Sequence, residues 1–387
     1  MTKSITDRRK IVFINQATGY ITIDIINEFA KEFDDVGVIT GEIRIQDVPL
    51  NPKVLKSYVI KKSRKSNLKR FGRWFIASLQ IFFLLITKYR KFEIFYISVP
   101  PFAYFSSIVL RRRFSILMWD VYPDALIMAG ISTRHIIYRI WTRLNNSLFR
   151  RAFRIYTIGE VLKMQLTKYI NPEKIVIIPL WSGISECEII DKNKNPFIQE
   201  QNLTGKFIVQ YSGNLGAGHN IETLLEVARI TQYEPDIVYL IIGRGTKVEK
   251  VRNIIDYNNL TNCRLLPYQP DNMIRHSLAA ADLNVVLVED IIASVSIPSK
   301  IYNLMAVGSP IISLSSQDSE ICKMVKYFGN GCNFKSNEYE GIASFVLRMK
   351  NSPDELARYR DRSLRASKGF TSANAKRFLV DYLDEDK

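Results

Sequence analysis

Three loops in the second half of the chain carry residue types that bind phosphate. The first, YSGNLGAGH (211–219), follows an apolar run and precedes a helix-like segment. Glycines let the backbone approach a ligand closely, and a ring N–H at a helix entrance can meet a phosphate oxygen. The loop therefore predicts a phosphate site, with a tight strand-to-helix turn and a capping histidine as the alternative. Its candidate contacts are Gly213, Asn214, Gly216, Gly218 and His219.

The second loop, LIIGRGTK (240–247), repeats the order strand, Gly-x-Gly, helix, and its candidate contact is Gly243. This pattern alone is weak evidence for a ligand site, and a purely structural loop is the alternative. Neither loop has the spacing G-x-G-x-x-G, so a dinucleotide fingerprint is not predicted.

The third loop, SVSIPSKIYNLMAVGSP (294–310), places a lysine in the first turn of an apolar helix. Pro298 suits that turn because it has no N–H to lose. We expect the N–H groups of Ser299, Lys300 and Ile301 to point out of the helix end, where the helix dipole adds positive charge. A cation is unfavourable there unless an anion binds beside it. The sequence therefore predicts a diphosphate between Lys300 and the first glycine loop.

Alternating strand-like and helix-like segments must position these loops. Short apolar runs typical of buried parallel strands alternate with segments of helical spacing in both halves of the chain. This order predicts βαβ units, and in open α/β sheets ligands bind beyond the carboxyl ends of the strands. The expected strands are 10–15, 36–40, 57–62, 92–98, 114–119, 154–159, 174–180, 206–213, 236–243, 263–268 and 282–288, with one more after the third loop.

The predicted fold class is α/β, with two Rossmann-like domains. A length of 387 residues favours two domains. A polar stretch of weak periodicity that contains Pro196 and Gly205 separates them. The expected divisions are an N-terminal domain at 1–183, a linker at 184–205, a C-terminal domain at 206–368 and a C-terminal helix at 369–387 that packs back.

Positive charge is concentrated in the first half. Residues 1–183 carry 30 Lys and Arg against 13 Asp and Glu, a balance of +17, and the remaining residues carry 24 against 25, a balance of −1. The stretch 61–73 holds seven basic residues and no acid, and it leads into the apolar run 74–87. That run is shorter than the ~20 residues of a transmembrane helix. It suits the plane of an anionic membrane surface, with a core helix behind a solvated basic segment as the alternative.

Composition indicates a globular protein, with 47% hydrophobic and 24% charged residues. The four cysteines lack CxxC or Cys/His ligand spacing, and no secretory signal precedes the first strand, so we expect reduced thiols in the cytoplasm. The basic run lacks interleaved aromatic residues and no nucleic-acid-binding motif occurs, so nucleic acid is not an expected partner. The cysteines are Cys187, Cys263, Cys322 and Cys332.

Four stretches occur in the order seen in glycosyltransferase family 4, and the chain resembles the branch that builds bacterial surface polysaccharides. They are YSGNLGAGHNIETLLEVA, IIGRGTK, LLPYQPDNMIRHSLAAADLNVVLV and VSIPSKIYNLMAVGSPIISL. The resemblance extends more weakly to 118–131 and 155–183, so it covers most of residues 10–313. It implies retaining enzymes of GT-B fold, in which a cleft separates the two domains.

The resemblance implies a nucleotide-sugar donor, which we expect to be UDP-linked, in the C-terminal domain. Its diphosphate would lie at Gly213–His219 and Ser299–Lys300, and its base near Leu266–Tyr268. No Asp-x-Asp motif of the GT-A type occurs, so neither a metal nor another cofactor is expected. The expected donor contacts are Gly213, Asn214, Gly216, Gly243, Leu266, Pro267, Tyr268, Glu289, Pro298, Ser299, Lys300, Tyr302 and Asn303; His219, Lys300 and Asp120 are the expected catalytic residues.

The acceptor would bind the N-terminal domain. Asp120, in WDVYPD at a strand end, is the candidate nearest the reacting hydroxyl, with a turn cap as the alternative. Tyr122, Pro123 and Asp124 are expected to support that turn. The expected acceptor or membrane contacts are Thr18, Gly19, Arg70, Arg73, Trp74 and Phe75.

Two positions depart from the family pattern. The family commonly has two glutamates eight positions apart, and here these positions are Val295 and Asn303. Asn303 can still hydrogen-bond a ribose hydroxyl, but the carboxylate contact to the sugar is lost, with Glu289 and Asp290 as candidate replacements. Many members also have a basic pair in the glycine loop, so Lys300 is expected to carry more of the charge.

Together these features predict a transferase that passes a sugar to a polyprenyl-diphosphate-linked acceptor. The protein would be peripheral at the inner face of the cell membrane. One alternative is a nucleotide-sugar epimerase of the same fold, which needs acid and base carboxylates near the sugar and no membrane patch. The other is a non-catalytic membrane-bound module, which Val295 would favour.

Overall fold

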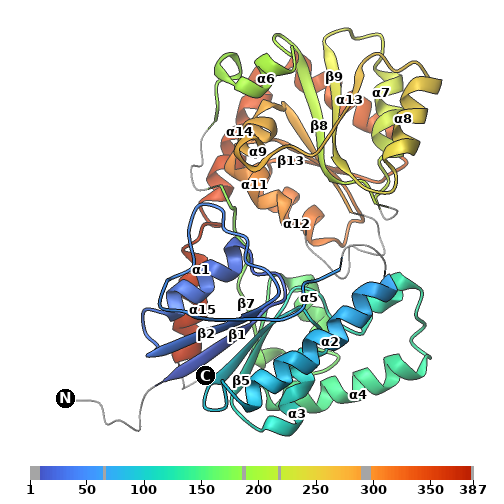
Figure 1. Ribbon diagram of the computed structural model, residues 1–387. Helices are drawn as coiled ribbons and strands as arrows, with labels where there is room; N and C mark the ends of the chain where they lie inside the picture. Colours follow the sequence, from blue (N-terminus) through green and yellow to red (C-terminus); the bar gives the residue numbers. More distant parts are fainter. Residues whose placement is uncertain (1–8, 64–66, 185–188, 217–218, 289–297, 385–387) are drawn as a thin grey trace. The chain divides into compact units, whose positions relative to one another are not determined.

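Two compact units make up the chain (Figure 1). The computed structural model describes residues 9–63, 67–184, 189–216, 219–288 and 298–384. Unit 1 consists of Met1–Gly183 and Ser372–Lys387, and unit 2 is the continuous stretch Ile184–Thr371. Each unit contains one parallel sheet flanked by helices, which confirms the fold class expected from the sequence.

The sheet of unit 1 has seven strands in the order β3-β2-β1-β4-β5-β6-β7. Helices cover a parallel sheet on both faces, so its central strands are continuous apolar runs rather than alternating ones. The strand order reverses between β1 and β4, which leaves room for a ligand beyond their carboxyl ends. The strands are β1 (Lys10–Ile14), β2 (Asp35–Thr40), β3 (Leu55–Tyr58), β4 (Glu93–Ile97), β5 (Phe114–Met118), β6 (Arg154–Thr157) and β7 (Ile175–Ile177).

The helices of unit 1 include the long segment that follows the basic run. In the described part of the chain, no helix combines the length and the apolar character needed to cross a membrane. The helices are α1 (Tyr20–Phe29), α2 (Asn67–Ile86), α3 (Ser106–Leu110), α4 (Ile136–Arg151), α5 (Glu160–Leu166) and α15 (Asn374–Leu383), with short 3-10 turns at Ala103–Phe105, Asp124–Ala129 and Pro172–Lys174.

The last helix, α15, belongs to unit 1 although it follows unit 2 in the chain. It packs against α1, and its Tyr382 ring lies 5.3 Å from both the Phe29 and the Phe153 ring centroids. Phe378 and Tyr382 are fully buried. The segment expected as a separate C-terminal helix is therefore an integral part of the first hydrophobic core.

The sheet of unit 2 has six strands in the order β10-β9-β8-β11-β12-β13. Its order reverses between β8 and β11, so the glycine loop after β8 lies at the point where open sheets bind ligands. The strands are β8 (Phe207–Asn214), β9 (Ile237–Arg244), β10 (Cys263–Leu266), β11 (Leu283–Leu287), β12 (Ile311–Leu314) and β13 (Gly331–Phe334).

Most helices of unit 2 belong to one of two groups, and the helices within each group pack against one another. One group pairs α7 with α13, and the other contains α6, α9, α11 and α14. The helices are α6 (Pro196–Glu200), α7 (Glu222–Ile230), α8 (Val248–Tyr257), α9 (Asp271–Ala280), α11 (Lys300–Ala306), α12 (Glu320–Phe328), α13 (Tyr339–Asn351) and α14 (Pro353–Ser367).

The expected linker is wrong for its described part, 189–205. Asn195 caps α6 by accepting a hydrogen bond from the Phe197 N–H, and its side-chain amide donates to the His276 carbonyl at 2.9 Å. Phe197, Ile198 and Leu203 are at most 2% exposed and form a core with β8 and β9. The stretch is mostly polar, so the sequence analysis did not identify these few apolar side chains as core residues. Their burial makes the segment part of unit 2.

Candidate functional site

The two glycine loops of unit 2 interlock through their backbones. Gly213 of β8 pairs with Gly243 of β9, and a Cβ on Gly243 would lie 2.0 Å from the Gly213 carbonyl oxygen. Gly245 has φ +154° and a Cβ there would lie 2.2 Å from the Leu215 carbonyl oxygen. Neither position has space for a side chain. Gly243, expected as a donor contact, thus has a packing reason of its own.

Lys300 extends from the start of α11 to the glycine loop. Its Nζ lies 4.1 Å from the Tyr211 ring centroid and 3.5 Å from the point that a Cβ on Gly213 would occupy. The Tyr211 hydroxyl donates to the Asn214 carbonyl at 2.8 Å, which holds the ring in place. The ammonium and the loop backbone predicted to share a diphosphate are therefore side by side.

No described carboxylate pairs with Lys300, and burial alone lowers its pKa to about 7. His219 is also shifted: burial, then Lys300 and Lys247, lower its pKa. Its Nδ1 is buried without a hydrogen-bond partner among the described residues, and it lies 3.7 Å from the position of a Cβ on Gly216. An anion bound between them would favour the charged form of Lys300 and could accept a hydrogen bond from the His219 ring.

The helix end offers fewer free amides than the sequence predicted. The Ile301 N–H donates to the Pro298 carbonyl at 3.2 Å, so it is already used inside the turn. Ser299 is exposed and precedes the helix without a side-chain cap. The helix also has only seven residues. The Lys300 ammonium, rather than a row of three amides, is therefore the main positive group here.

Two expected contacts on α11 have different environments. Tyr302 is 1% exposed and its ring centroid lies 4.9 Å from that of Phe370, so its side chain belongs to the core and the prediction of a donor contact is wrong for it. Asn303 is only partly buried. Glu289, Asp290 and Val295, like Gly218, lie outside the described residues.

The expected base-binding segment follows β10. Leu266 is partly buried, Pro267 is exposed and the Tyr268 side chain is 50% exposed. The Arg244 guanidinium lies 5.0 Å from the Tyr268 ring centroid. Arg244 was missed from the sequence, although its place between two glycines at a strand end is a usable signal. An exposed ring beside a guanidinium suits a flat, anionic ligand.

In unit 1, Asp120 lies just beyond β5. The N–H groups of Trp119 and Asp120 donate to the Ser98 Oγ at 2.7 and 3.3 Å. Burial raises the pKa of Asp120, while Lys62 and Arg70 act in the opposite direction. Burial lowers the pKa of Lys62, and Asp120 partly restores it. Lys62 was missed because the basic run did not reveal which of its members lies near Asp120.

The turn after Asp120 is a structural support, as expected. Asp124 is 3% exposed and accepts hydrogen bonds from the Tyr138 hydroxyl at 3.0 Å and the Tyr169 hydroxyl at 2.5 Å. The Tyr122 ring lies between Trp74 of α2 and Trp141 of α4, with ring centroids 5.7 and 5.8 Å away. The turn therefore joins both helices to the sheet edge.

The loop after β1 is mostly structural. Thr18 is fully buried and its Oγ1 donates to the Thr40 Oγ1 at 2.9 Å, so the prediction of a ligand contact is wrong for its side chain. Gly19 precedes α1 and has open space where a Cβ would be.

Helix α2 has a buried face and an exposed apolar face. Trp74 is 2% exposed, so its expected role as a membrane contact is wrong, whereas the adjacent Phe75 is 58% exposed. Arg73 is exposed and donates to the Lys61 carbonyl at 3.1 Å, and the Arg70 guanidinium lies 5.3 Å from the Trp74 ring centroid. The exposed apolar side chains, which we call the α2 stripe, are Phe75, Ile76, Leu79, Phe83 and Ile86.

Further exposed apolar residues lie on neighbouring helices. Ile108 and Val109 lie on α3, which packs against α2. Ile136, Ile137 and Ile140 form an exposed cluster at the start of α4 that the sequence analysis did not single out. Exposed arginines lie close to that cluster in the sequence: Arg134, Arg139 and Arg143.

Comparison with known proteins places this geometry in a class. Residues 192–365 match the family model for glycosyl transferases group 1. The probable glycosyltransferase WbjE of Pseudomonas aeruginosa is 24% identical over 340 residues, which is 85% of this chain and 85% of the relative. The chain is a glycosyltransferase of the hexosyltransferase type, and its matched part belongs to group 1.

Solved structures give the fold its name. HepE (Alr3699) of Anabaena, determined in complex with UDP-glucose, has a TM-score of 0.72 at 14% identity, over 97% of this chain and 99% of that chain. WaaG, a glycosyltransferase involved in lipopolysaccharide biosynthesis, has a TM-score of 0.68 at 12% identity with the same coverage. The fold is therefore GT-B.

Proposed function

We propose that the protein is a retaining glycosyltransferase of family 4 that uses a UDP-sugar. It would transfer the sugar to a lipid-linked saccharide during synthesis of a bacterial surface polysaccharide. The observation that carries the proposal is the Lys300 ammonium, held against Tyr211 and the Gly213 backbone without a described carboxylate partner. A partly buried cation in that position fits the diphosphate of a nucleotide sugar.

Lys300 would act on the departing diphosphate. Cleavage of the donor bond places negative charge on the diphosphate, and fixed positive groups that meet this charge stabilise the transition state more than the ground state. Arrival of the anion favours the protonated Lys300, and the His219 ring can donate a hydrogen bond from the same loop. We expect no metal requirement, so EDTA should leave the transfer rate unchanged. A rate that falls with EDTA and returns with Mg²⁺ would overturn that part.

The choice of UDP rests on two features. The HepE structure named above contains UDP-glucose, and the Tyr268 ring with Arg244 offers an exposed flat surface at the end of β10, beside the strands that carry the glycine loops. The uracil would lie against this segment. Asn303 would hydrogen-bond the ribose.

Asp120 would orient the acceptor hydroxyl in unit 1. Its raised pKa and the nearby Lys62 and Arg70 describe a partly buried carboxylate in a positive environment, which suits an anionic acceptor. Asp120→Asn should lower the rate constant for transfer at least 100-fold while leaving donor binding unchanged. A loss of donor binding in this variant would show that Asp120 contacts the donor rather than the acceptor, and would contradict the proposal.

The α2 stripe and the basic residues of unit 1 would bring the enzyme to its lipid-linked acceptor. Each Lys or Arg near an anionic surface contributes roughly 1 kcal/mol to the free energy of membrane binding. The side chains of the apolar stripe would insert into the membrane interface and strengthen this binding. In sedimentation with anionic vesicles at low salt, the wild type should be found in the pellet with the vesicles. The triple variant Phe75→Ser, Leu79→Ser, Phe83→Ser should stay in the supernatant. Failure of the wild type to pellet at any salt concentration would remove the membrane part.

The donor experiment is a thermal-shift panel of UDP, GDP, UDP-sugars and GDP-sugars on the wild type and Lys300→Ala. A ligand at ~100 times its dissociation constant adds about 2.7 kcal/mol to the free energy of unfolding. We expect UDP and one UDP-sugar to stabilise only the wild type. If no nucleotide stabilises it, the donor site is wrong. Turnover of a UDP-sugar without any acceptor would identify an epimerase instead.

A further inference from the structure

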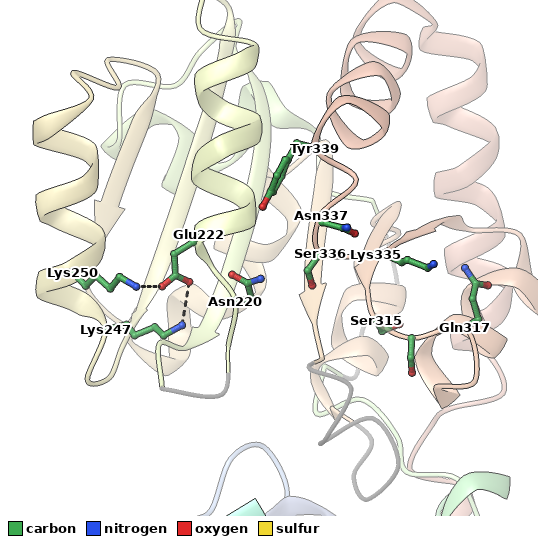
Figure 2. Close-up of a pocket in the computed structure, with 11 residues that line it drawn as sticks. Asn220, Glu222, Lys247, Lys250, Ser315, Gln317, Lys335, Ser336, Asn337 and Tyr339 are labelled. Atoms are coloured by element: carbon green, nitrogen blue, oxygen red, sulfur yellow. Dashed lines mark hydrogen bonds and ion pairs between the residues drawn. The ribbon is translucent and has the colours of Figure 1, made fainter.

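Away from the residues proposed to bind the donor, unit 2 contains a concave surface, which we call the β12–β13 pocket. It is a cavity of about 870 Å³, within the size range of sites for small molecules. The first turns of α7 and α8 form one wall, and the segments that follow β12 and β13 form the other (Figure 2). Tyr211, Gly213, Tyr268 and Lys300 are not among its described lining residues, so it is separate from the donor site.

The pocket is built where ligands bind in sheets of this kind. Its second wall begins directly at the carboxyl ends of β12 and β13, and helices α7 and α13 pack against each other behind it. The Thr223 hydroxyl donates to the Ser336 carbonyl at 2.7 Å and ties the two walls together. The walls are therefore fixed by the fold rather than by a ligand.

Positive charge exceeds negative charge in this pocket. Its described lining contains Lys247, Lys250 and Lys335 against Glu222 alone, a balance of +2. Glu222 is shared, with 3.1 Å to the Lys247 Nζ and 2.7 Å to the Lys250 Nζ (Figure 2). The Lys335 ammonium, on the other wall, makes no hydrogen bond or ion pair with any described residue. An anionic group is needed to match these charges.

The remaining lining favours a ligand rich in hydroxyl groups. The Asn220 and Asn337 side-chain amides face the pocket from opposite walls, and neither is hydrogen-bonded to another described residue. The Tyr339 ring, partly buried against the core, lines the same pocket and offers an aromatic surface. Free amides and an aromatic ring bind sugars, and the lysines bind phosphate.

From these observations we propose that the β12–β13 pocket binds a phosphorylated sugar at a site separate from the donor site. This proposal does not rest on the proposed identity of the donor. Lys247 joins the two sites, because its Nζ donates to the His219 carbonyl at 2.8 Å as well as to Glu222. A phosphate that attracts Lys247 would therefore change the hydrogen bonding of the glycine loop.

Titration calorimetry with glucose 1-phosphate and with inorganic phosphate tests the proposal on the full chain. We expect the wild type to bind glucose 1-phosphate more tightly than phosphate. Lys300→Ala should bind glucose 1-phosphate with the same affinity as the wild type. Lys335→Gln should lower its affinity about tenfold, since a hydrogen bond to a charged group is lost. Lys323→Gln, an exposed lysine outside the pocket with the same change of charge, is the matched control.

Three results would overturn the proposal. One is the absence of glucose 1-phosphate binding at millimolar concentration. Another is binding that Lys300→Ala abolishes and Lys335→Gln leaves intact, which would place the sugar phosphate in the donor site. The third is equal affinity for phosphate and glucose 1-phosphate, which would remove the sugar. Failure of the donor proposal looks different, because nucleotides then bind nowhere while the effect of Lys335→Gln persists.

Discussion

At the scale of single residues, Lys300 is a group whose position costs stability until a ligand arrives. Its partly buried side chain places the ammonium beside an aromatic ring and glycine backbone, and its pKa is lowered to about 7. Removal of a charge from water is unfavourable unless another charge compensates it. Binding sites commonly retain such groups because the ligand supplies the compensation.

Lys300→Met should therefore stabilise the free protein and abolish nucleotide binding. We expect the free energy of unfolding to rise by about 1–3 kcal/mol, because a methionine side chain fits the buried site without a charge. Scanning calorimetry of the free protein measures this gain, and the thermal-shift panel measures the lost response. Lys323→Met, at an exposed position, should change neither. A less stable Lys300→Met protein would contradict the account.

Donor affinity should depend on pH through the same residue. In the free protein Lys300 loses its proton near pH 7, and a bound diphosphate raises its pKa, so binding takes up a proton above pH 7. The affinity for the nucleotide sugar should be flat below pH 7 and fall up to tenfold per unit from about pH 7 to 8.5. Calorimetry in buffers of different ionisation enthalpy counts the proton. A flat profile would show that Lys300 stays charged.

At the scale of elements, α2 shows how far sequence patterns reach. The apolar run and its basic lead-in predicted a helix at an interface, and the helix is present. The pattern did not separate its two faces, because both are apolar. Consequently Trp74, expected on the surface, lies in the core beside Tyr122, and the exposed stripe begins only at Phe75.

Adjacent substitutions in α2 should therefore have opposite effects. Trp74→Ala should lower the free energy of unfolding by about 3–5 kcal/mol, because it removes a buried aromatic side chain. Phe75→Ser should change it by no more than about 0.5 kcal/mol, since that side chain is 58% exposed. Urea denaturation compares the two. Equal destabilisation would mean that the stripe is packed against something within the protein.

The limits of prediction follow from local composition. The strands of both sheets that are long and apolar were expected from the sequence, whereas β13, GCNF, was not, because a glycine and an asparagine interrupt so short a run. Helix α6 was missed for the same reason, with only Phe197 and Ile198 to mark its buried face. The meeting of Lys300 with Gly213 was predicted because both belong to loops expected at the carboxyl ends of strands. Arg244, Lys62 and the β12–β13 pocket were not predicted, because they depend on residues that are close in space but distant in the sequence.

At the scale of the whole molecule, the C-terminal helix closes the first core. Removing residues 372–387 should unfold unit 1, because Phe378 and Tyr382 leave their places against Tyr156, Phe29 and Phe153. Unit 2 keeps its own core. Limited proteolysis should then yield a resistant fragment that starts near residue 184. Val380→Ala, at a 57% exposed position of the same helix, should leave the pattern unchanged, and a truncated chain as resistant as the wild type would refute the prediction.

The same discontinuity sets an order for synthesis on the ribosome. Unit 2 is a single continuous stretch of the chain, residues 184–371, so we expect that it can fold while translation proceeds. Unit 1 must wait, with β1 to β7 already made, until α15 emerges. Its unfinished core is exposed throughout that interval. Unit 1 is therefore the part that completes its fold last, whereas unit 2 can be exchanged between relatives as one uninterrupted segment.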